Sequence, residues 1–259
     1  MTASELLNHL WSDYTRLAPQ ARDIVARIER RGERVVNDHV ALRTINLPGA
    51  DIADVAAPFL AAGWTWADDD YHFPAKKLRA RYLRAPETDM PRVFISALQL
   101  QEMPPAVAEL LRSIVDPAIA GGLVVPGRPW TVGHAQYEAL RRVSEYAAWF
   151  AACGWRVNHF TVSVNHLTGF ADFAAFMRWV ESEGFPLNDH GGLIKGSAAV
   201  GLEQGSTMAP TVPITLADGT WELPGCYVEF ALRHPVNGTL FDGFLPESAD
   251  KIFESTDKS

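Results

Sequence analysis

Three strand-like stretches decide the fold of this chain: Asn37-Asp38-His39-Val40-Ala41-Leu42-Arg43, Asn158-His159-Phe160-Thr161-Val162-Ser163-Val164 and Tyr227-Val228-Glu229-Phe230-Ala231-Leu232-Arg233. Each stretch carries one side chain that binds metals well, namely His39, His159 or Glu229. Two histidines and a carboxylate form the set that holds Fe(II) and leaves coordination positions open. His159 lies 120 residues after His39, and Glu229 lies 70 residues after His159, so only the fold can assemble this set.

Alternation along each strand separates an apolar face from a face that carries the candidate ligand, because residues two apart share a face. The ligand faces comprise Asn37, His39, Ala41 and Arg43; His159, Thr161 and Ser163; and Tyr227, Glu229, Ala231 and Arg233. An antiparallel sheet with one solvated face is the alternative interpretation. Solvated faces usually carry Lys, Glu and Thr, whereas small side chains dominate here. The pattern therefore favours the interior of a cupped sheet.

Candidate substrate contacts lie close to these ligands. Arg43 follows His39 by four residues on the same face, ~13 Å further along the strand. Its guanidinium is suited to bind a remote carboxylate through two hydrogen bonds, although a surface salt bridge is the competing interpretation. Gln204 and Ser206 belong to a polar segment that precedes the glutamate strand and can line a pocket, with a turn as the alternative.

The strand-and-helix pattern occurs twice. Ala53-Asp54-Val55-Ala56-Ala57, after the first histidine, resembles Ala171-Asp172-Phe173-Ala174-Ala175, after the second. We expect an α+β fold in which two strand–helix–strands units form a cupped, mostly antiparallel sheet around a metal site, with helices packed outside. We expect one domain over 1–259. Its parts are a helical region (about 1–34), a first unit (35–116), a connector with a long helix at 137–153 (117–156) and a second unit (157–259).

Composition narrows the class of protein. The 259 residues are 47% hydrophobic and 21% charged, as in an ordinary soluble globular protein. A net charge of −8 without a basic stripe makes nucleic acid an unlikely partner. No apolar run is long enough to span a bilayer, and the N-terminus lacks the order of a signal peptide. The two cysteines form no paired motif. We therefore expect a cytoplasmic protein, and the oligomeric state stays open.

Several segments jointly resemble the 2-oxoadipate dioxygenase/decarboxylase family, which is related to the vicinal-oxygen-chelate enzymes. Besides the three strands, they include Gly191-Gly192-Leu193-Ile194-Lys195-Gly196-Ser197, Glu203-Gln204-Gly205-Ser206-Thr207-Met208-Ala209, Phe241-Asp242-Gly243-Phe244 and Ile252-Phe253-Glu254-Ser255-Thr256. The resemblance implies Fe(II) held by His39, His159 and Glu229, with Arg43 binding the distal carboxylate of the substrate. It also implies conversion of 2-oxoadipate and O₂ to 2-hydroxyglutarate and CO₂.

Two other functions remain open at this point. The same ligand set accepts Zn²⁺, Ni²⁺ or Mn²⁺, so a metal-dependent lyase or isomerase is one alternative. A non-catalytic module that binds a small metabolite is the other, but such a module has no need for two histidines and a glutamate. The leading hypothesis is an Fe(II) dioxygenase and decarboxylase whose partners are a small 2-oxo acid and O₂.

Overall fold

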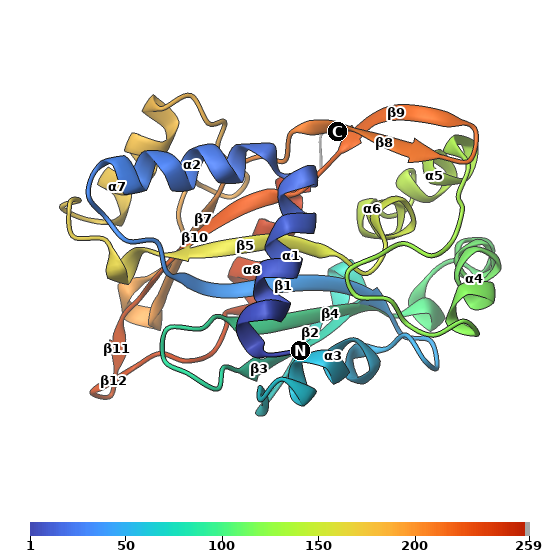
Figure 1. Ribbon diagram of the computed structural model, residues 1–259, viewed down its shortest axis with the longest axis horizontal. Helices are drawn as coiled ribbons and strands as arrows, with labels where there is room; N and C mark the ends of the chain where they lie inside the picture. The colour runs from blue at the N-terminus through green and yellow to red at the C-terminus, as the bar shows by residue number, and fades with distance from the viewer. Residues whose placement is uncertain (257–259) are drawn as a thin grey trace.

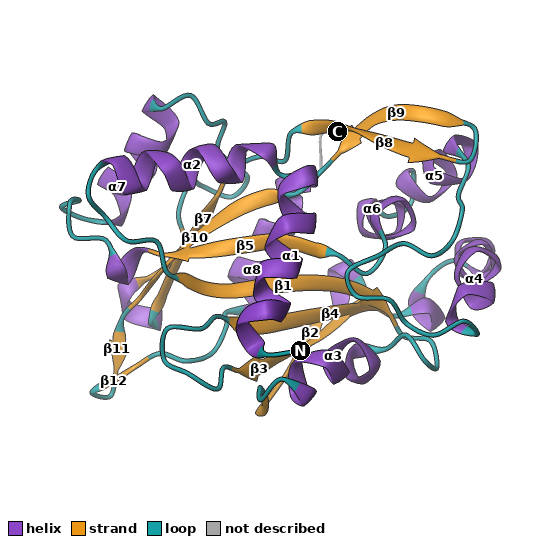
Figure 2. Cartoon of the chain, viewed as in Figure 1, coloured by secondary structure: helices purple, strands orange, loops and turns teal. Residues whose placement is uncertain are grey.

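The computed structural model describes residues 1–256, and within them eight strands join in one curled sheet (Figures 1 and 2). Its strands are β1 (Asn37–Ile45), β2 (Thr65–Phe73), β3 (Leu78–Arg84), β4 (Arg92–Leu98), β5 (Val157–Ser163), β6 (Lys195–Ser197), β7 (Leu202–Ser206) and β10 (Tyr227–Arg233). The remaining strands form two hairpins: β8 (Thr211–Leu216) with β9 (Gly219–Pro224), and β11 (Pro235–Val236) with β12 (Thr239–Leu240).

Two halves of the sheet repeat one pattern. The first is β1, helix α3 (Ile52–Ala61), β2, β3 and β4, and the second is β5, helix α7 (Phe173–Ser182), β6, β7 and β10. The strand order β2-β3-β4-β1-β5-β10-β7-β6 reads the same outward from the centre in both halves. Strand β1 pairs antiparallel with β5, while β4 and β10 flank them in parallel. The predicted α+β class is thus confirmed, in a mixed sheet.

The central pair is symmetric about Val40 and Phe160, which lie opposite each other. His39 faces Thr161 on one side of this point, and Ala41 faces His159 on the other. The two histidines therefore occupy equivalent places on neighbouring strands. Because opposed residues in an antiparallel pair point to one side of the sheet, both histidines face the same side.

Two register shifts adjoin the histidines at equivalent places. Asp38 is an extra residue on β1, and Asn158 is an extra residue on β5. Such bulges redirect side chains and are common beside functional sites. The first bulge also corrects the predicted face of Asn37. Asn37 pairs with Val162 and so belongs to the apolar face, because the bulge changes the alternation at Asp38.

The apolar core lies between the convex face of the sheet and its covering helices. Helix α1 (Ala3–Leu17) crosses in front of β1 and β5 (Figure 1) and contacts β5, and α3 contacts β1, β3 and β4. Phe160 is buried against Trp11 and Tyr14 of α1. Helix α2 (Pro19–Arg30) contacts β10. The burial of apolar side chains between the sheet and these helices supplies the main hydrophobic stabilisation of the sheet.

Not every helix packs outside, which corrects the predicted arrangement. Helix α8 (Pro246–Ile252) lies on the opposite side of the sheet from α1 (Figure 1), where it contacts β2, β6 and β7. The 3₁₀ turn η5 (Phe253–Thr256) follows it. The C-terminal segment thus spans the hollow between the two edge strands.

The predicted long helix at 137–153 is two helices, α5 (His134–Arg141) and α6 (Glu145–Cys153). Ser144 breaks them apart with an extended backbone, and its hydroxyl accepts a hydrogen bond from the backbone N–H of Ala147. This is ordinary N-cap chemistry. The break places Glu145 in the first turn of α6. Helix α4 (Pro105–Ile119) completes this helical region (Figure 2). Among residues 1–256, no helix is both long and apolar enough to cross a membrane.

Candidate metal centre

The sheet brings the three predicted ligands together in a buried cluster. One ligand atom from each of His39, His159 and Glu229 lies within 4.8 Å of the others, and the described residues contain no second group of this kind. The Nε2 atom of His159 is 3.2 Å from Glu229 Oε2, and that of His39 is 3.5 Å from Oε1. The side chains come from the central strands β1 and β5 and from β10, which pairs with β5.

Both histidines are oriented by the residue that precedes them. The Nδ1 atom of His39 is 2.8 Å from an Asp38 oxygen, and that of His159 is 3.2 Å from the Asn158 side-chain oxygen. An oxygen acceptor at Nδ1 fixes the proton there and leaves the Nε2 lone pair available. The two bulges thus give both rings the tautomer that binds a metal through Nε2.

Asp38 is in turn held by a buried arginine. Arg233 donates from Nε to Asp38 Oδ2 at 2.6 Å and from Nη2 to Oδ1 at 2.9 Å. Burial alone would raise the pKa of Asp38, but the charge of Arg233 and the hydrogen bond with His39 hold that pKa well below its usual range. The carboxylate behind His39 is therefore ionised. This pairing also gives Arg233 a structural partner on the neighbouring half of the sheet.

Burial acts on the ligands themselves. It raises the pKa of the Glu229 carboxyl, against the opposing effects of His39 and a 2.7 Å hydrogen bond from Gln204 Nε2. It also lowers the pKa of His159 well below its usual value, and the neighbouring His39 and Arg43 lower that pKa further. The histidine is thus held neutral, the form in which imidazole binds a metal.

The donor set fits a divalent metal. Both rings carry their proton on Nδ1, so the two Nε2 lone pairs face the oxygens of the Glu229 carboxylate with no proton between them. Lone pairs that face each other in this way repel. A cation between the three groups removes this repulsion. In this structure the Thr161 hydroxyl, 3.1 Å from His39 Nε2, donates to the His39 lone pair that a metal would take. Buried polar atoms around the cluster lack hydrogen-bond partners among the described residues, namely Gln204 Oε1, Tyr227 Oη and Asn158 Nδ2.

Aromatic rings enclose the cluster. Tyr227 stacks on His159 with ring centroids 4.6 Å apart. Phe244, from the segment before α8, packs edge-on against His39 at 4.8 Å and also contacts Phe94. Both aromatic residues are buried, so they shield the histidines from water. The sequence reasoning did not assign Tyr227 or Phe244 to the site, although both lie in segments that it had singled out.

The predicted substrate residues have protein partners in this structure. Arg43 is buried and binds Glu145 and Thr256, while Gln204 holds Glu229 and Ser206 shares a 2.8 Å hydrogen bond with Ser255. Their roles as substrate contacts stay predictions. Asp38 was missed as a functional residue, and the signal that could have found it is the shared Asn/Asp–His pattern on both strands.

Sequence comparison identifies the family. Residues 2–118 and 127–239 match the family of 2-oxoadipate dioxygenase/decarboxylases. This chain belongs to that family. It is 34% identical to the chloroplastic 2-oxoadipate dioxygenase/decarboxylase of Arabidopsis thaliana, over 86% of this chain and 69% of the relative. It is 32% identical to the chloroplastic/amyloplastic enzyme of Oryza sativa, over 97% and 78%. The resemblance stated from the motifs is thereby confirmed.

Solved structures agree with this assignment. The hydroxyglutarate synthase of Oryza sativa in complex with 2-oxoadipate has a TM-score of 0.87 at 30% identity, covering 98% of this chain and 91% of that one. A protein from Shewanella frigidimarina, whose name calls it a hydrolase, has a TM-score of 0.88 at 40% identity, covering 94% and 97%. A protein of the glyoxalase superfamily from Ralstonia eutropha shares the fold, with a TM-score of 0.77 at 21% identity over 92% and 84%. The two plant relatives are named as plastid proteins, so the expected cytoplasmic location stays a prediction.

Proposed function

We propose that this chain is an Fe(II)-dependent dioxygenase that converts 2-oxoadipate and O₂ to 2-hydroxyglutarate and CO₂. The observation that carries the proposal is the buried convergence of His39 Nε2, His159 Nε2 and the Glu229 carboxylate. Family membership supports the reaction, because the curated relatives at 34% and 32% identity are 2-oxoadipate dioxygenase/decarboxylases. Family membership also favours this reaction over the alternatives of a lyase, an isomerase or a non-catalytic binding module.

The chain's own residues hold, orient and shield the reacting groups. His39, His159 and Glu229 would hold the iron, which supplies the O₂ chemistry of decarboxylation and hydroxylation when bound. Asp38 and Asn158 keep both Nε2 atoms free of protons. Such outer partners typically change metal affinity or activity by about 10- to 100-fold.

Other residues arrange the site around the substrate. Gln204 keeps the Glu229 carboxylate in position, and Phe244 limits the access of water to His39. Arg43 is the proposed partner of the distal carboxylate. It is buried four residues beyond His39 on the same strand, and its Nε has no hydrogen-bond partner among the described residues. Gln204 Oε1 and the Ser206 hydroxyl are the proposed polar contacts nearer Glu229.

The direct test is a screen of 2-oxo acids for oxygen uptake and CO₂ release by protein reconstituted anaerobically with Fe(II). We expect 2-oxoadipate to be consumed with one O₂ taken up and one CO₂ released per 2-hydroxyglutarate formed. Reconstitution with Zn²⁺, which has no redox chemistry, should give no oxygen uptake. Turnover of a 2-oxo acid by the Zn²⁺ form without O₂ would instead favour a lyase or isomerase.

A further inference from the structure

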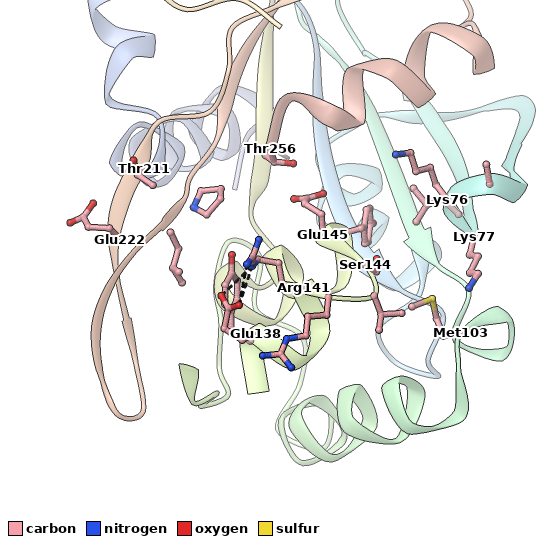
Figure 3. A pocket seen from close by; sticks show the side chains of 18 residues that line it. Lys76, Lys77, Met103, Glu138, Arg141, Ser144, Glu145, Thr211, Glu222 and Thr256 are labelled. Carbon is pink, nitrogen blue, oxygen red and sulfur yellow. Dashed lines mark hydrogen bonds and ion pairs between the residues drawn. The ribbon is translucent and has the colours of Figure 1, made fainter. Parts of the chain in front are cut away.

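A cavity of about 580 Å³ lies beside the groups that hold Arg43 (Figure 3). Glu145, Tyr146 and Thr256 line it, and all three contact the Arg43 guanidinium. The lining contains four basic residues, Lys76, Lys77, Arg141 and Arg142, and, with Glu145 included, three acidic ones. The cavity therefore leads from a slightly basic surface to the partners of a buried arginine, which suits the approach of an anion.

Within this arrangement, Glu145 is already an anionic ligand of Arg43. Its two oxygens lie 3.0 and 3.3 Å from Arg43 Nη1, and Thr256 accepts from Nη2 at 3.0 Å. The rings of Tyr146 and Trp149 lie 4.8 and 5.0 Å from the guanidinium carbon. A substrate carboxylate that binds Arg43 through Nη1 must therefore compete with the Glu145 carboxylate for that nitrogen.

Burial indicates which partner moves. The side chain of Arg43 is 1% exposed, whereas that of Glu145 is 22% exposed and borders the cavity. Glu145 stands in the first turn of α6, where the partial positive charge of the helix stabilises a carboxylate that has left Arg43. Arg43 is held by contacts with two aromatic rings and with Thr256, so the rearrangement falls on Glu145.

We propose that Glu145 is a carboxylate gate that occupies Arg43 in the free protein and is displaced by the distal carboxylate of a dicarboxylic acid. This inference rests on the proposed role of Arg43 as the distal-carboxylate partner. The gate makes Glu145 a specificity-determining residue. An acid with a distal carboxylate breaks the Arg43–Glu145 ion pair but forms a new ion pair with Arg43 in its place. An acid that ends in a methyl group forms no such pair, so displacement of Glu145 would leave Arg43 buried without an anion.

The test compares binding of adipate and hexanoate to Fe(II)-loaded protein by calorimetry without O₂. The two acids have equal chain length, and only adipate has a second carboxylate. We expect Glu145→Gln to bind adipate about three- to tenfold more tightly than the wild type, because the competing charge is gone. Hexanoate affinity should not change. Glu145→Asp keeps the charge but shortens its reach, so it should give a smaller gain in the same direction.

Glu138→Gln is the matched control. Glu138 lines the same cavity with similar exposure, but it pairs with Arg141 at 3.1 Å and not with Arg43 (Figure 3). We expect this variant to bind adipate as the wild type does. Equal or weaker adipate binding by both Glu145 variants would overturn the gate, and so would an equal gain for hexanoate.

Oxygen uptake with 2-oxoadipate separates this inference from the proposed function. If both hold, Glu145→Gln lowers the KM for 2-oxoadipate by the same factor with little change in kcat. Turnover of 2-oxoadipate without any gain in adipate affinity for Glu145→Gln would contradict the role of Glu145 as a gate but leave the proposed reaction standing. A gain in adipate affinity without turnover of 2-oxoadipate would leave the gate standing and remove the proposed reaction.

Discussion

Asp38 and Arg233 form a buried ion pair directly behind His39, with donor–acceptor distances of 2.6 and 2.9 Å. The same Asp38 carboxylate accepts from His39 Nδ1. Arg233 lies on β10, four residues after Glu229, while Asp38 lies on β1. One ion pair therefore links the two halves of the sheet and sets the tautomer of a candidate metal ligand.

Replacing Asp38 by Asn should weaken both stability and metal binding. The variant leaves the charge of Arg233 buried without its anion, and we expect a loss of about 3 kcal/mol in the free energy of unfolding. It also removes the anionic acceptor at His39 Nδ1, so metal affinity should fall by about 10- to 100-fold. Urea titration with a chelator present measures the first effect, and a competitive metal titration measures the second.

Asp242→Asn provides a comparison within the same network of charges. Asp242 binds Arg84 and Arg92 but makes no contact with His39, and its side chain is 38% exposed. We expect a smaller loss of stability and an unchanged metal affinity. Equal effects of the two variants on metal affinity would show that the acceptor at Nδ1 is not what matters.

Acid should unfold the metal-free protein partly through Asp38. Its pKa is lower in the folded protein than in the unfolded chain, where an aspartate titrates near ~3.9. The unfolded state therefore binds the proton first as the pH falls. The contribution of Asp38 is fully present above about pH 5 and declines below about pH 4. The difference in unfolding free energy between wild type and Asp38→Asn, measured from pH 7 to pH 2, should shrink over that lower range.

Glu229→Gln should have opposite effects on the metal-free and metal-bound protein. Without metal, the amide of the variant removes a buried charge. It can also donate a hydrogen bond to His159 Nε2, which faces the Glu229 carboxylate in the wild type. The metal-free variant should therefore be at least as stable as the wild type. A metal at about 100 times its dissociation constant should stabilise the wild type by about 3 kcal/mol and the variant by almost nothing.

Thermal unfolding with and without added Fe(II) or Zn²⁺ measures this difference under anaerobic conditions. Glu203→Gln is a suitable control, because Glu203 lies on β7 near Glu229 but binds His234 instead of the cluster. Wild-type stabilisation by metal in Glu229→Gln would contradict the assignment of this carboxylate as a ligand.

The strand alternation was enough to predict the ligand face, because side-chain direction in a regular strand depends only on parity. It placed His39, His159 and Glu229 on one side of the sheet. It failed at Asn37, because the extra residue at Asp38 changes the parity of everything before it. A bulge leaves no mark in the alternation of apolar and polar residues. The pattern therefore predicted neither the face on which Asn37 lies nor the contact between Asp38 and His39.

Two other features depend on contacts between distant segments. The apolar pattern continues from α5 into α6, so the break at Ser144 is set by its cap and by packing rather than by periodicity. The C-terminal segment lacks a regular pattern before α8, yet it returns across the hollow of the sheet. Glu145 and Phe244 reach the site through these two features, which is why the sequence alone did not place them there.

Replacing Phe244 by Ala should destabilise the fold and expose the metal site. Phe244 is 6% exposed and its ring packs against His39 and Phe94, so we expect a cost of about 3 to 5 kcal/mol in unfolding free energy. Loss of the ring should also speed release of bound metal to a chelator, because water reaches His39 more easily. Leu240→Ala, at a side chain that is 48% exposed in the preceding hairpin, should change neither quantity. Destabilisation of Phe244→Ala with an unchanged rate of metal release would mean that this ring supports the fold without covering the metal.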